Sequence, residues 1–600
     1  MQLPSMRLHA LMQNSLRQPP AANADFRAKS PVRSIGIWKS FWIAIAFAAI
    51  LSTTRAVELG DTQDYASDIA DHLGKSPFGP ANSLWEFGHL LWRPAGWLLA
   101  TIAAPILSTL TDWTPVMQAS FCLILISIAC SIITVILWYQ LLIDVTRSSI
   151  AASLIALAVS CSHGFLLYAH SGCAYIPGLM FLTASVWLIR RDCIGAGAIS
   201  YALATLVWLP FILAGAGLLI VVALPSAWET PLKDSFRSIR PARAIRFAAI
   251  SASCVVIVFG LALAARRISS IDKASSWYSE SQHGWSQSIR AVRIATGLPR
   301  AFLYLGKDGV LYRRYLSHDP YAPVAMGDLV KASLWKIVAF DLFLAAFLYE
   351  LLRRAQSGWP LLLFLAGAVP VVFFAVFLFE PGSPERYLPA FPFLILALGW
   401  ILRDFWPNRR VTQVVVAGFL LCVVLTNGYS FYAPRVSREN GEALRRIAGL
   451  RNRFAGTGIA VVVTNQDPIE DMINRSTFGA INRPSTFPIY DAVEPATLRV
   501  LQWREEFAAR ALKVWKAGGE VWISKRAWNV RPRPEWNWVE GDDKRVTWGG
   551  MVQFFSVLQT DADLGGEDGF SRLTRNDSNQ AVLTPFASAY REPQSVKKKE

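Results

Sequence analysis

Residues 55–97 read RAVELGDTQDYASDIADHLGKSPFGPANSLWEFGHLLWRPAGW and lie between two apolar segments. The apolar run before them, residues 37–54, has the length that a helix needs to cross a bilayer. The stretch itself is rich in carboxylates and also carries His89 and Arg93. The sequence therefore predicts a cluster of ionisable side chains held at a membrane surface, where a lipid-borne substrate could meet it.

Composition indicates an integral membrane protein. Of the 600 residues, 53% are hydrophobic and only 17% are charged, whereas about a quarter are charged in a typical soluble domain. The net charge of +16 is assigned to cytoplasmic loops that face anionic lipid, and no nucleic-acid partner is expected because no binding motif accompanies the charge. The seven cysteines have no metal-ligand spacing and form no disulfide framework.

The distribution of Lys and Arg predicts how the chain crosses the membrane. The basic tail 1–35 is expected in the cytoplasm, followed by an uncleaved signal anchor. Residues 36–432 are expected to form about eleven transmembrane helices, with the outer loops 55–114 and 266–332 on the non-cytoplasmic side. The expected spans are 37–54, 115–143, 148–169, 175–189, two crossings within 194–225 hinged at 208–210, 247–265, 332–352, 358–379, 387–402 and 411–431.

One apolar segment, residues 98–110, is left out of this count. Its far end at 111–113 has no basic residue, and an extra crossing here would invert every later loop against its charge. We interpret this segment as an amphipathic helix that lies in the outer interface of the bilayer, although the sequence leaves a spanning helix open.

Residues 433–600 are polar and are predicted to form an extracytoplasmic α/β accessory domain with a loosely ordered tail, 530–600. Helix-like and strand-like runs alternate here, as is typical of such domains. The runs are 438–453, 458–464, 496–516 and 520–524. Gly518 and Gly519 precede a strand instead of opening a helix, so they do not form a phosphate-binding loop.

The acidic segment after the first span has the pattern of a helix with an apolar and an acidic face. Asp61 stands at its start, where it can cap the helix, and Asp64 three residues later would complete a capping box. The same position suits catalysis. A carboxylate at the membrane edge near His89 and Arg93 can take a proton from an acceptor hydroxyl while cations hold a phosphate. The spacing alone leaves both roles open.

Three motifs, in this order, resemble the GT-C superfamily of integral-membrane glycosyltransferases, nearest the protein O-mannosyltransferases and the lipid A aminoarabinose transferases. The first is 61–65 (DTQDY), in which Tyr follows Asp by four positions. The second is 89–98 (HLLWRPAGWL), and the third is 386–392 (RYLPAFP), which opens a late helix from the outer side. The resemblance covers about residues 36–432. All three motifs share the predicted outer face.

The resemblance implies a polytopic α-helical fold and the inverting transfer of a sugar from a polyprenyl-phosphate donor to a glycan, lipid or protein acceptor. Asp61 would be the general base, with Asp64 as its helper or alternative. Thr62 stands where protein O-mannosyltransferases have Glu, which points away from a protein acceptor. The expected location is the cell inner membrane, as a multi-pass protein with a cytoplasmic N-terminus and a periplasmic C-terminal domain.

The substrate-binding residues implied by the same motifs are Tyr65, His89, Arg93, Arg386 and Tyr387. Each cation also has a structural alternative. His89 can be a packed, hydrogen-bonded side chain, Arg93 can reach lipid headgroups, and Arg386 can pair with Glu380 or Glu385. An Arg fork is well suited to hold a phosphate. No cofactor is required, and a divalent metal is possible but not demanded, because these cations can neutralise a monophosphate.

Two other classes of protein fit parts of the sequence. A transporter or lipid flippase should carry ionisable residues along its path, and Asp341 is the main candidate within a span. A receptor would need its helices only as an anchor, for which so many spans are excessive. The charges gather at one face, which favours surface chemistry. The sequence leaves the sugar, the acceptor, the oligomeric state and the role of 433–600 open.

Overall fold

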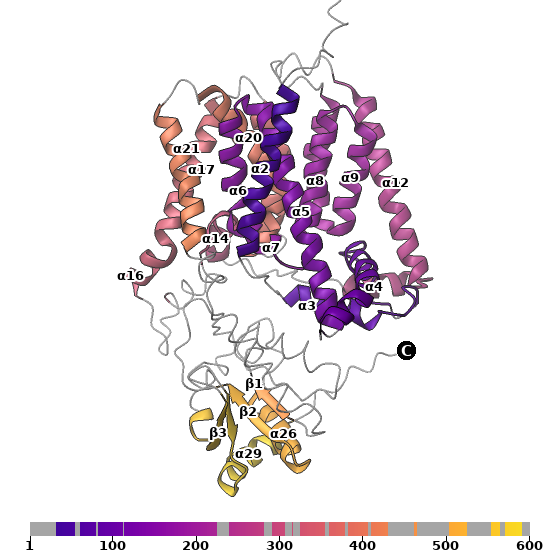
Figure 1. The fold of residues 1–600 in the computed structure, drawn as a ribbon, viewed down its shortest axis with the longest axis vertical. Helices are drawn as coiled ribbons and strands as arrows, with labels where there is room; N and C mark the ends of the chain where they lie inside the picture. Colours follow the sequence, from indigo (N-terminus) through magenta and orange to yellow (C-terminus); the bar gives the residue numbers. More distant parts are fainter. Residues whose placement is uncertain are drawn as a thin grey trace, which may run out of the picture.

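The computed structural model forms a bundle of helices followed by a small sheet with two helices beside it (Figure 1). The described residues are 32–53, 60–79, 82–111, 113, 115–224, 239–280, 291–305, 315, 325–353, 359–377, 382–405, 410–429, 461–464, 503–524, 554–564 and 570–590.

The first half of the bundle consists of long apolar helices and one acidic helix. Its elements are α2 (Val32–Thr53), α3 (Gly60–Asp71), α4 (Trp92–Leu110), α5 (Pro115–Thr146), α6 (Ser149–Ser160), α7 (His163–Ala169), α8 (Tyr175–Arg190), α9 (Ile194–Val207), the 3-10 helix η2 (Leu209–Ala214), α10 (Gly215–Ala223) and α12 (Pro241–Ala265).

The second half contains more irregular helices. Its elements are α13 (Ile271–Glu280), α14 (Ala291–Phe302), α16 (Met326–Leu329), the π-helix η3 (Val330–Leu334), α17 (Trp335–Arg353), α18 (Trp359–Leu363), the π-helix η4 (Phe364–Ala368), α19 (Val369–Phe377), the 3-10 helix η5 (Pro384–Ala390), α20 (Phe391–Phe405) and α21 (Arg410–Asn427).

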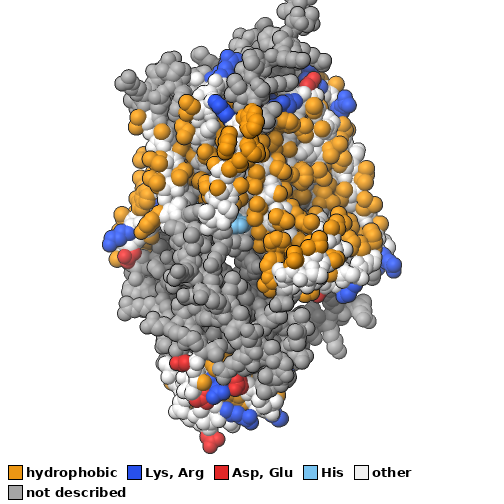
Figure 2. Space-filling model, viewed as in Figure 1, with side chains coloured by type: hydrophobic (Ala, Val, Ile, Leu, Met, Phe, Trp, Pro, Cys, Tyr) orange, Lys and Arg blue, Asp and Glu red, His pale blue; other side chains and the backbone are white. Residues whose placement is uncertain are grey.

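Every predicted span coincides with one or more of these helices. Within the described part of the chain, four helices are long and apolar enough to cross a membrane, and the bent pair α6 and α7 would make a fifth. They are Pro115–Thr146, Pro241–Ala265, Met326–Arg353 and Pro384–Arg403. The other spans correspond to shorter apolar helices, so the total of about eleven stays a prediction. Figure 2 shows hydrophobic side chains covering much of the visible bundle, with Lys and Arg mostly toward its ends.

Two predicted spans contain breaks. The hinge expected at 208–210 is present: α9 ends at Val207, Trp208 is extended, and η2 carries Pro210, which has no N–H to continue a helix. The span 148–169, predicted as one helix, is instead bent by 68° between α6 and α7. Here Ser162 is extended, and Gly164 lets α7 approach α14, since a Cβ would lie 3.1 Å from the Ala301 oxygen.

The apolar segment 98–110 lies within α4. Leu98, Ile102, Ile106 and Leu110, one per helical turn, form an exposed stripe along it. The helix is not among the described helices that meet the length and composition of a span. Figure 1 shows α4 near the same end of the bundle as α3 and α14. This arrangement fits the interface helix that the sequence predicts.

After residue 460 the structure has a four-stranded sheet in the order β1-β2-β4-β3, with β1 and β2 parallel and the other pairs antiparallel. The helices pack Phe507 and Leu583 with Phe555 and Ile523 into a separate core. The elements are β1 (Val461–Thr464), α26 (Trp503–Lys516), β2 (Glu520–Ser524), β3 (Thr560–Leu564), β4 (Phe570–Leu573) and α29 (Asp577–Ala589).

The prediction of a loosely ordered 530–600 is wrong for 554–564 and 570–590, which supply two strands and a capped helix. The side chain of Asn576 accepts a hydrogen bond from the Asn579 N–H at 2.8 Å and caps α29. These elements are short, and the prolines and lysines around them obscure the periodicity that would indicate strands and a helix. The helix predicted at 438–453 lies outside the described residues.

Candidate functional site

A cavity of about 760 Å³ lies where α3, the loop before α4, α8, η2 and η5 meet. Six of the seven predicted site residues line it: Asp61, Asp64, Tyr65, His89, Arg93 and Arg386. The seventh, Tyr387, is fully buried and is not part of the lining. The structure thus brings together residues that are more than 300 positions apart in the chain.

Helix α3 is anchored so that its acidic face borders this cavity. Thr62 is fully buried, and its hydroxyl accepts a hydrogen bond from the Gly172 N–H at 3.0 Å. A Cβ on Gly172 would lie 2.5 Å from Thr62 Cγ2, so the contact requires glycine. On the same helix, Ile69 packs against Gly96 of α4, where a Cβ would lie 2.7 Å from Ile69 Cδ1. The departure from the family pattern at Thr62 therefore has a packing role.

Asp61 is an accessible carboxylate in the cavity and has a defined hydrogen-bond partner. It is exposed, and its Oδ2 accepts a hydrogen bond from the Tyr175 hydroxyl at 2.6 Å. It is the second residue of α3, inside the first turn, so it is not the residue preceding the helix that the capping interpretation required. A carboxylate is favourable in this turn because of the helix dipole. Asp64, one turn later, is also exposed toward the cavity.

Arg93 is held by two carboxylates of its own chain. Its guanidinium lies 2.5 Å from Asp68 and 2.9 Å from Glu86, and it also donates to the Ser83 carbonyl at 2.8 Å. The side chain is 10% exposed, so the interpretation that it reaches lipid headgroups is wrong. Burial raises the pKa of Asp68, and the charge of Arg93 opposes this shift. Arg93, in the first turn of α4, links this helix to α3 and to the loop between them, and its charge is already neutralised there.

His89 uses both ring nitrogens within the protein. Nδ1 lies 3.2 Å from the Val207 carbonyl oxygen, which can only accept, so Nδ1 carries the proton. In the neutral ring, Nε2 then accepts from the Tyr65 hydroxyl, 3.1 Å away. Burial lowers the pKa of His89, and burial, followed by the nearby Asp61 and Glu86 charges, raises the pKa of Tyr65. This geometry favours the packed role that the sequence left open for His89.

Arg386 lies in η5 and brings the second chain segment to the cavity. Its guanidinium carbon lies 5.3 Å from the ring centroid of Trp208, and its Nε lies 3.5 Å from Glu385 Oε1. The pairing with Glu385 that the sequence left open is therefore present, while Glu380 lies outside the described residues. The carboxylate of Glu385 also accepts a short hydrogen bond from the Tyr168 hydroxyl. Arg386 still lines the cavity.

Sequence reasoning missed the aromatic wall of this cavity. Tyr175, Trp208 and Tyr278 line it, and Tyr278 packs against Phe87 with ring centroids 5.1 Å apart. Trp208 stands at the predicted hinge, and Tyr175 opens a predicted span from the outer side. The sequence indicates only that these two aromatic residues stand at a hinge and at the start of a span. It does not indicate which residues they contact.

The cavity has carboxylates but no metal-binding geometry. Among the residues that the structure describes, no group of three or more His, Cys, Asp or Glu side chains is arranged to hold a metal ion. The arrangement offers an accessible carboxylate, Asp61, and a guanidinium, Arg386, in one cavity at the end of an apolar bundle. These groups can accept a proton and stabilise an anion.

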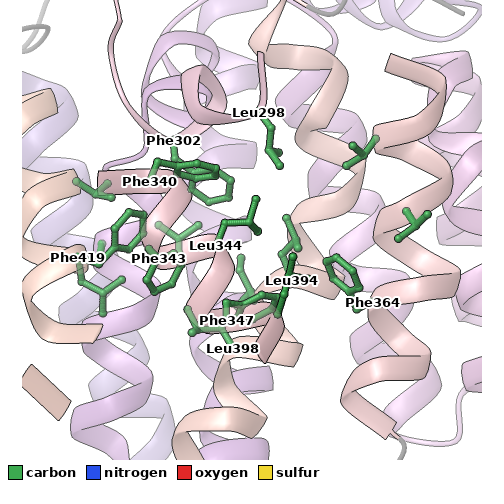
Figure 3. A pocket seen from close by; sticks show the side chains of 18 of the residues that line it. Leu298, Phe302, Phe340, Phe343, Leu344, Phe347, Phe364, Leu394, Leu398 and Phe419 are labelled. Atoms are coloured by element: carbon green, nitrogen blue, oxygen red, sulfur yellow. The ribbon is translucent and has the colours of Figure 1, made fainter. Parts of the chain in front are cut away.

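A second cavity, of about 360 Å³, is lined only by Ala, Val, Ile, Leu and Phe side chains from α6, α14, α17, η4, α19, α20 and α21. Figure 3 shows the Phe and Leu side chains of these helices projecting toward one another around it. Phe343 of α17 stacks on Phe419 of α21 with ring centroids 3.7 Å apart. Helix α19 borders both cavities, because Phe374 lines the charged one and Phe373 the apolar one.

Comparison with known proteins finds similarity only at the level of solved structures. No protein-family model and no curated protein sequence matches the chain. The chain is similar to ArnT from Cupriavidus metallidurans in its apo state, with 11% identity, 92% of this chain and 99% of that chain covered, and a TM-score of 0.49. For the same protein bound to undecaprenyl phosphate the values are 11%, 91%, 98% and 0.46. At this level of similarity, the chemistry has to be derived from the cavity itself.

Proposed function

We propose that this protein is a membrane glycosyltransferase that moves a sugar from a polyprenyl-phosphate donor to a hydroxyl acceptor on the extracytoplasmic face. One observation carries the proposal: an exposed carboxylate, Asp61, and a guanidinium, Arg386, line the same cavity at the end of an apolar helical bundle. A lipid-linked phosphate dissolved in the bilayer would present its charged head at this level. Each of the three motifs that resemble the GT-C superfamily contributes side chains to the lining of this cavity.

The reaction that suits these groups is a single displacement. The acceptor oxygen attacks the anomeric carbon, and its proton passes to Asp61. The bond between the anomeric carbon and the phosphate oxygen breaks, and the polyprenyl phosphate leaves with the electron pair. Arg386 stabilises the added negative charge by charge-assisted hydrogen bonds. Attack opposite the leaving group inverts the anomeric configuration.

The other predicted residues would support this pair. Asp64 would assist Asp61 from the next turn of α3, and Tyr65, oriented by His89, would border the sugar. Arg93 would hold α3 in place through Asp68 and Glu86. In this proposal residues 36–432 form the catalytic unit, the cavity end faces the periplasm, and 433–600 form an accessory domain on that side. The basic tail 1–35 would remain in the cytoplasm.

The transporter alternative has less support. Its main candidate, Asp341, is exposed on α17 and lines neither cavity. The charged side chains of this cavity come from α3, the first turn of α4 and η5, and not from the length of one long helix. A transport path would need polar groups along its length.

Lipid binding tests the proposal. The full-length protein would be purified, stripped of lipid, placed in nanodiscs and titrated with undecaprenyl phosphate, and the lipids that copurify would be identified by mass spectrometry. We expect a polyprenyl phosphate to copurify, and undecaprenyl phosphate to bind more tightly than a straight-chain alkyl phosphate of equal carbon number. Binding no tighter than that of the straight-chain lipid would contradict the proposal.

A further inference from the structure

Asp61 and Arg386 are connected by a ring of buried side chains that the mechanism above does not use. Tyr175, at the start of α8, donates its hydroxyl to Asp61 Oδ2 at 2.6 Å and is 4% exposed. With Oδ2 engaged in this way, Oδ1 is the oxygen left to face an acceptor. The carboxylate is thereby held in one orientation.

The ring of Tyr175 contacts two further aromatic side chains. Its centroid lies 4.7 Å from that of Tyr168 on α7 and 4.7 Å from that of Trp208 at the α9–η2 break, both in edge-to-face geometry. Trp208 is 2% exposed. Such pairs stabilise a defined mutual orientation. The rotation of Tyr175 is therefore fixed from two sides.

These neighbours both lead to Arg386. Trp208 lies beneath its guanidinium at 5.3 Å, and Tyr168 donates a hydrogen bond to Glu385, whose other oxygen lies 3.5 Å from Arg386 Nε. The bond from Tyr168 occupies Glu385 and limits how strongly this carboxylate can compete for the guanidinium. Tyr175, Tyr168, Glu385, Arg386 and Trp208 thus form a closed circuit of contacts, and Asp61 is attached to it through Tyr175.

We propose that Tyr175 is a positioning residue for Asp61, and that Tyr168 is the corresponding positioning residue for Arg386 through Glu385. This assignment rests on the proposed function, because it gives the two tyrosines roles in that reaction. Tyr175 holds one oxygen of Asp61 by a hydrogen bond, so losing the hydroxyl frees the carboxylate to leave this orientation. Tyr168 affects the phosphate-binding side, because losing its hydroxyl lets Glu385 pair more closely with Arg386.

The two Tyr→Phe substitutions form a matched pair, since each removes one oxygen and keeps the ring contacts. Carbodiimide reacts with carboxyl groups, so the rate at which it labels Asp61 at one fixed pH, mapped by peptide mass spectrometry, reports how this group is held without a donor. Undecaprenyl phosphate binding in nanodiscs reports the Arg386 side. Thermal unfolding of both variants would establish that they are folded.

We expect Tyr175→Phe to raise the labelling rate of Asp61 about three- to tenfold, because the hydrogen bond that holds the carboxylate is lost, without changing lipid affinity. Tyr168→Phe should leave that rate unchanged and weaken undecaprenyl phosphate binding about three- to tenfold. An unchanged labelling rate in Tyr175→Phe would overturn its assignment, and unchanged lipid affinity in Tyr168→Phe would overturn the other. Failure of the wild type to bind the lipid would instead contradict the proposed function, and the labelling measurement is independent of it because it needs no lipid.

Discussion

The two cavities differ in chemistry although one helix, α19, borders both. The charged cavity carries four carboxylates and two guanidinium groups in its lining. The apolar cavity, in the part of the structure that defines it, has no polar lining residue. The difference follows from location: the first lies where helices end and loops begin, and the second lies between helix faces, such as the face of α17 that carries Phe340, Phe343, Leu344 and Phe347.

This difference indicates which of the two cavities can support a chemical reaction. Lipid chains are as apolar as the Phe and Leu side chains of the second cavity, so it gains little hydrophobic free energy from an occupant and can select only by shape. The charged cavity can move a proton and stabilise an anion, because it holds both signs of charge in fixed positions. Each prediction below changes one side of this comparison.

The largest expected effect is on the rate of sugar transfer, when Asp61, the proposed general base, is replaced. Asp61→Asn should reduce sugar transfer by about a hundredfold or more, the contribution of a positioned general base, while the melting temperature stays close to wild type because Asn fits the same space. Transfer would be measured as release of polyprenyl phosphate from the sugar-loaded lipid that copurifies, with a native membrane extract as the source of acceptor. Asp64→Asn is the matched control and should lose less. Activity of the Asp61→Asn variant within a few-fold of wild type would rule out the catalytic role.

The next effect concerns the guanidinium. Arg386→Ala should weaken undecaprenyl phosphate binding by about 1.5–3 kcal/mol, the range for a hydrogen bond to a charged group, and Arg386→Lys should weaken it less because the charge remains but the fork is lost. Nanodisc titrations would measure both. If Arg386 only pairs with Glu385, both variants will bind the lipid normally and melt at lower temperature.

A smaller effect is expected from pH. Burial holds the pKa of His89 below its unfolded value of about 6.5, so the neutral form is the one that stabilises the fold. This contribution is fully present above about pH 6.5 and is lost as pH falls toward the depressed pKa. The melting temperature should therefore decline as the pH falls below about 6.5. His89→Gln should flatten part of this decline. An equal slope in wild type and His89→Gln would contradict the assignment.

The smallest effect is expected in the apolar cavity. Leu344→Trp places a larger side chain in this cavity of about 360 Å³, so it should change stability by less than the roughly 1–3 kcal/mol that overpacking a filled core costs. It should leave the affinity for a short-chain prenyl phosphate unchanged, because the phosphate is held in the other cavity. Titration of this variant with the short-chain lipid tests whether the two cavities act independently. If Leu344→Trp loses as much affinity as Arg386→Ala, they do not.

The sequence predicted the bundle better than the contacts inside it. Apolar length and basic flanks predicted the helix positions, and basic residues on both sides of 194–225 predicted the break before η2. The bend between α6 and α7 has no Pro at the break, and next to it Gly164 approaches Ala301, more than a hundred positions away. Local pattern cannot encode such a contact.

The candidate site shows the same limit. The motifs identified residues that the structure brings to one cavity, but not how they pair. The sequence leaves Arg93 open between phosphate binding and lipid headgroups, and in the structure it is instead paired with Asp68 and Glu86. Tyr175 was missed because its hydrogen bond to Asp61 joins residues 114 positions apart. Charge partners and aromatic neighbours depend on tertiary packing, which periodicity does not reveal.

The most direct measurement is a crosslinking map. An undecaprenyl phosphate analogue with a photoreactive diazirine on the first isoprene unit would be bound to the full-length protein in nanodiscs, irradiated, and located by peptide mass spectrometry. Our account predicts crosslinks to residues that line the charged cavity, such as Trp208, Leu213 and Phe374, with competition by unlabelled undecaprenyl phosphate and loss in Arg386→Ala. Competed crosslinks on α17 and α21 around the apolar cavity, with none in the charged cavity, would contradict it.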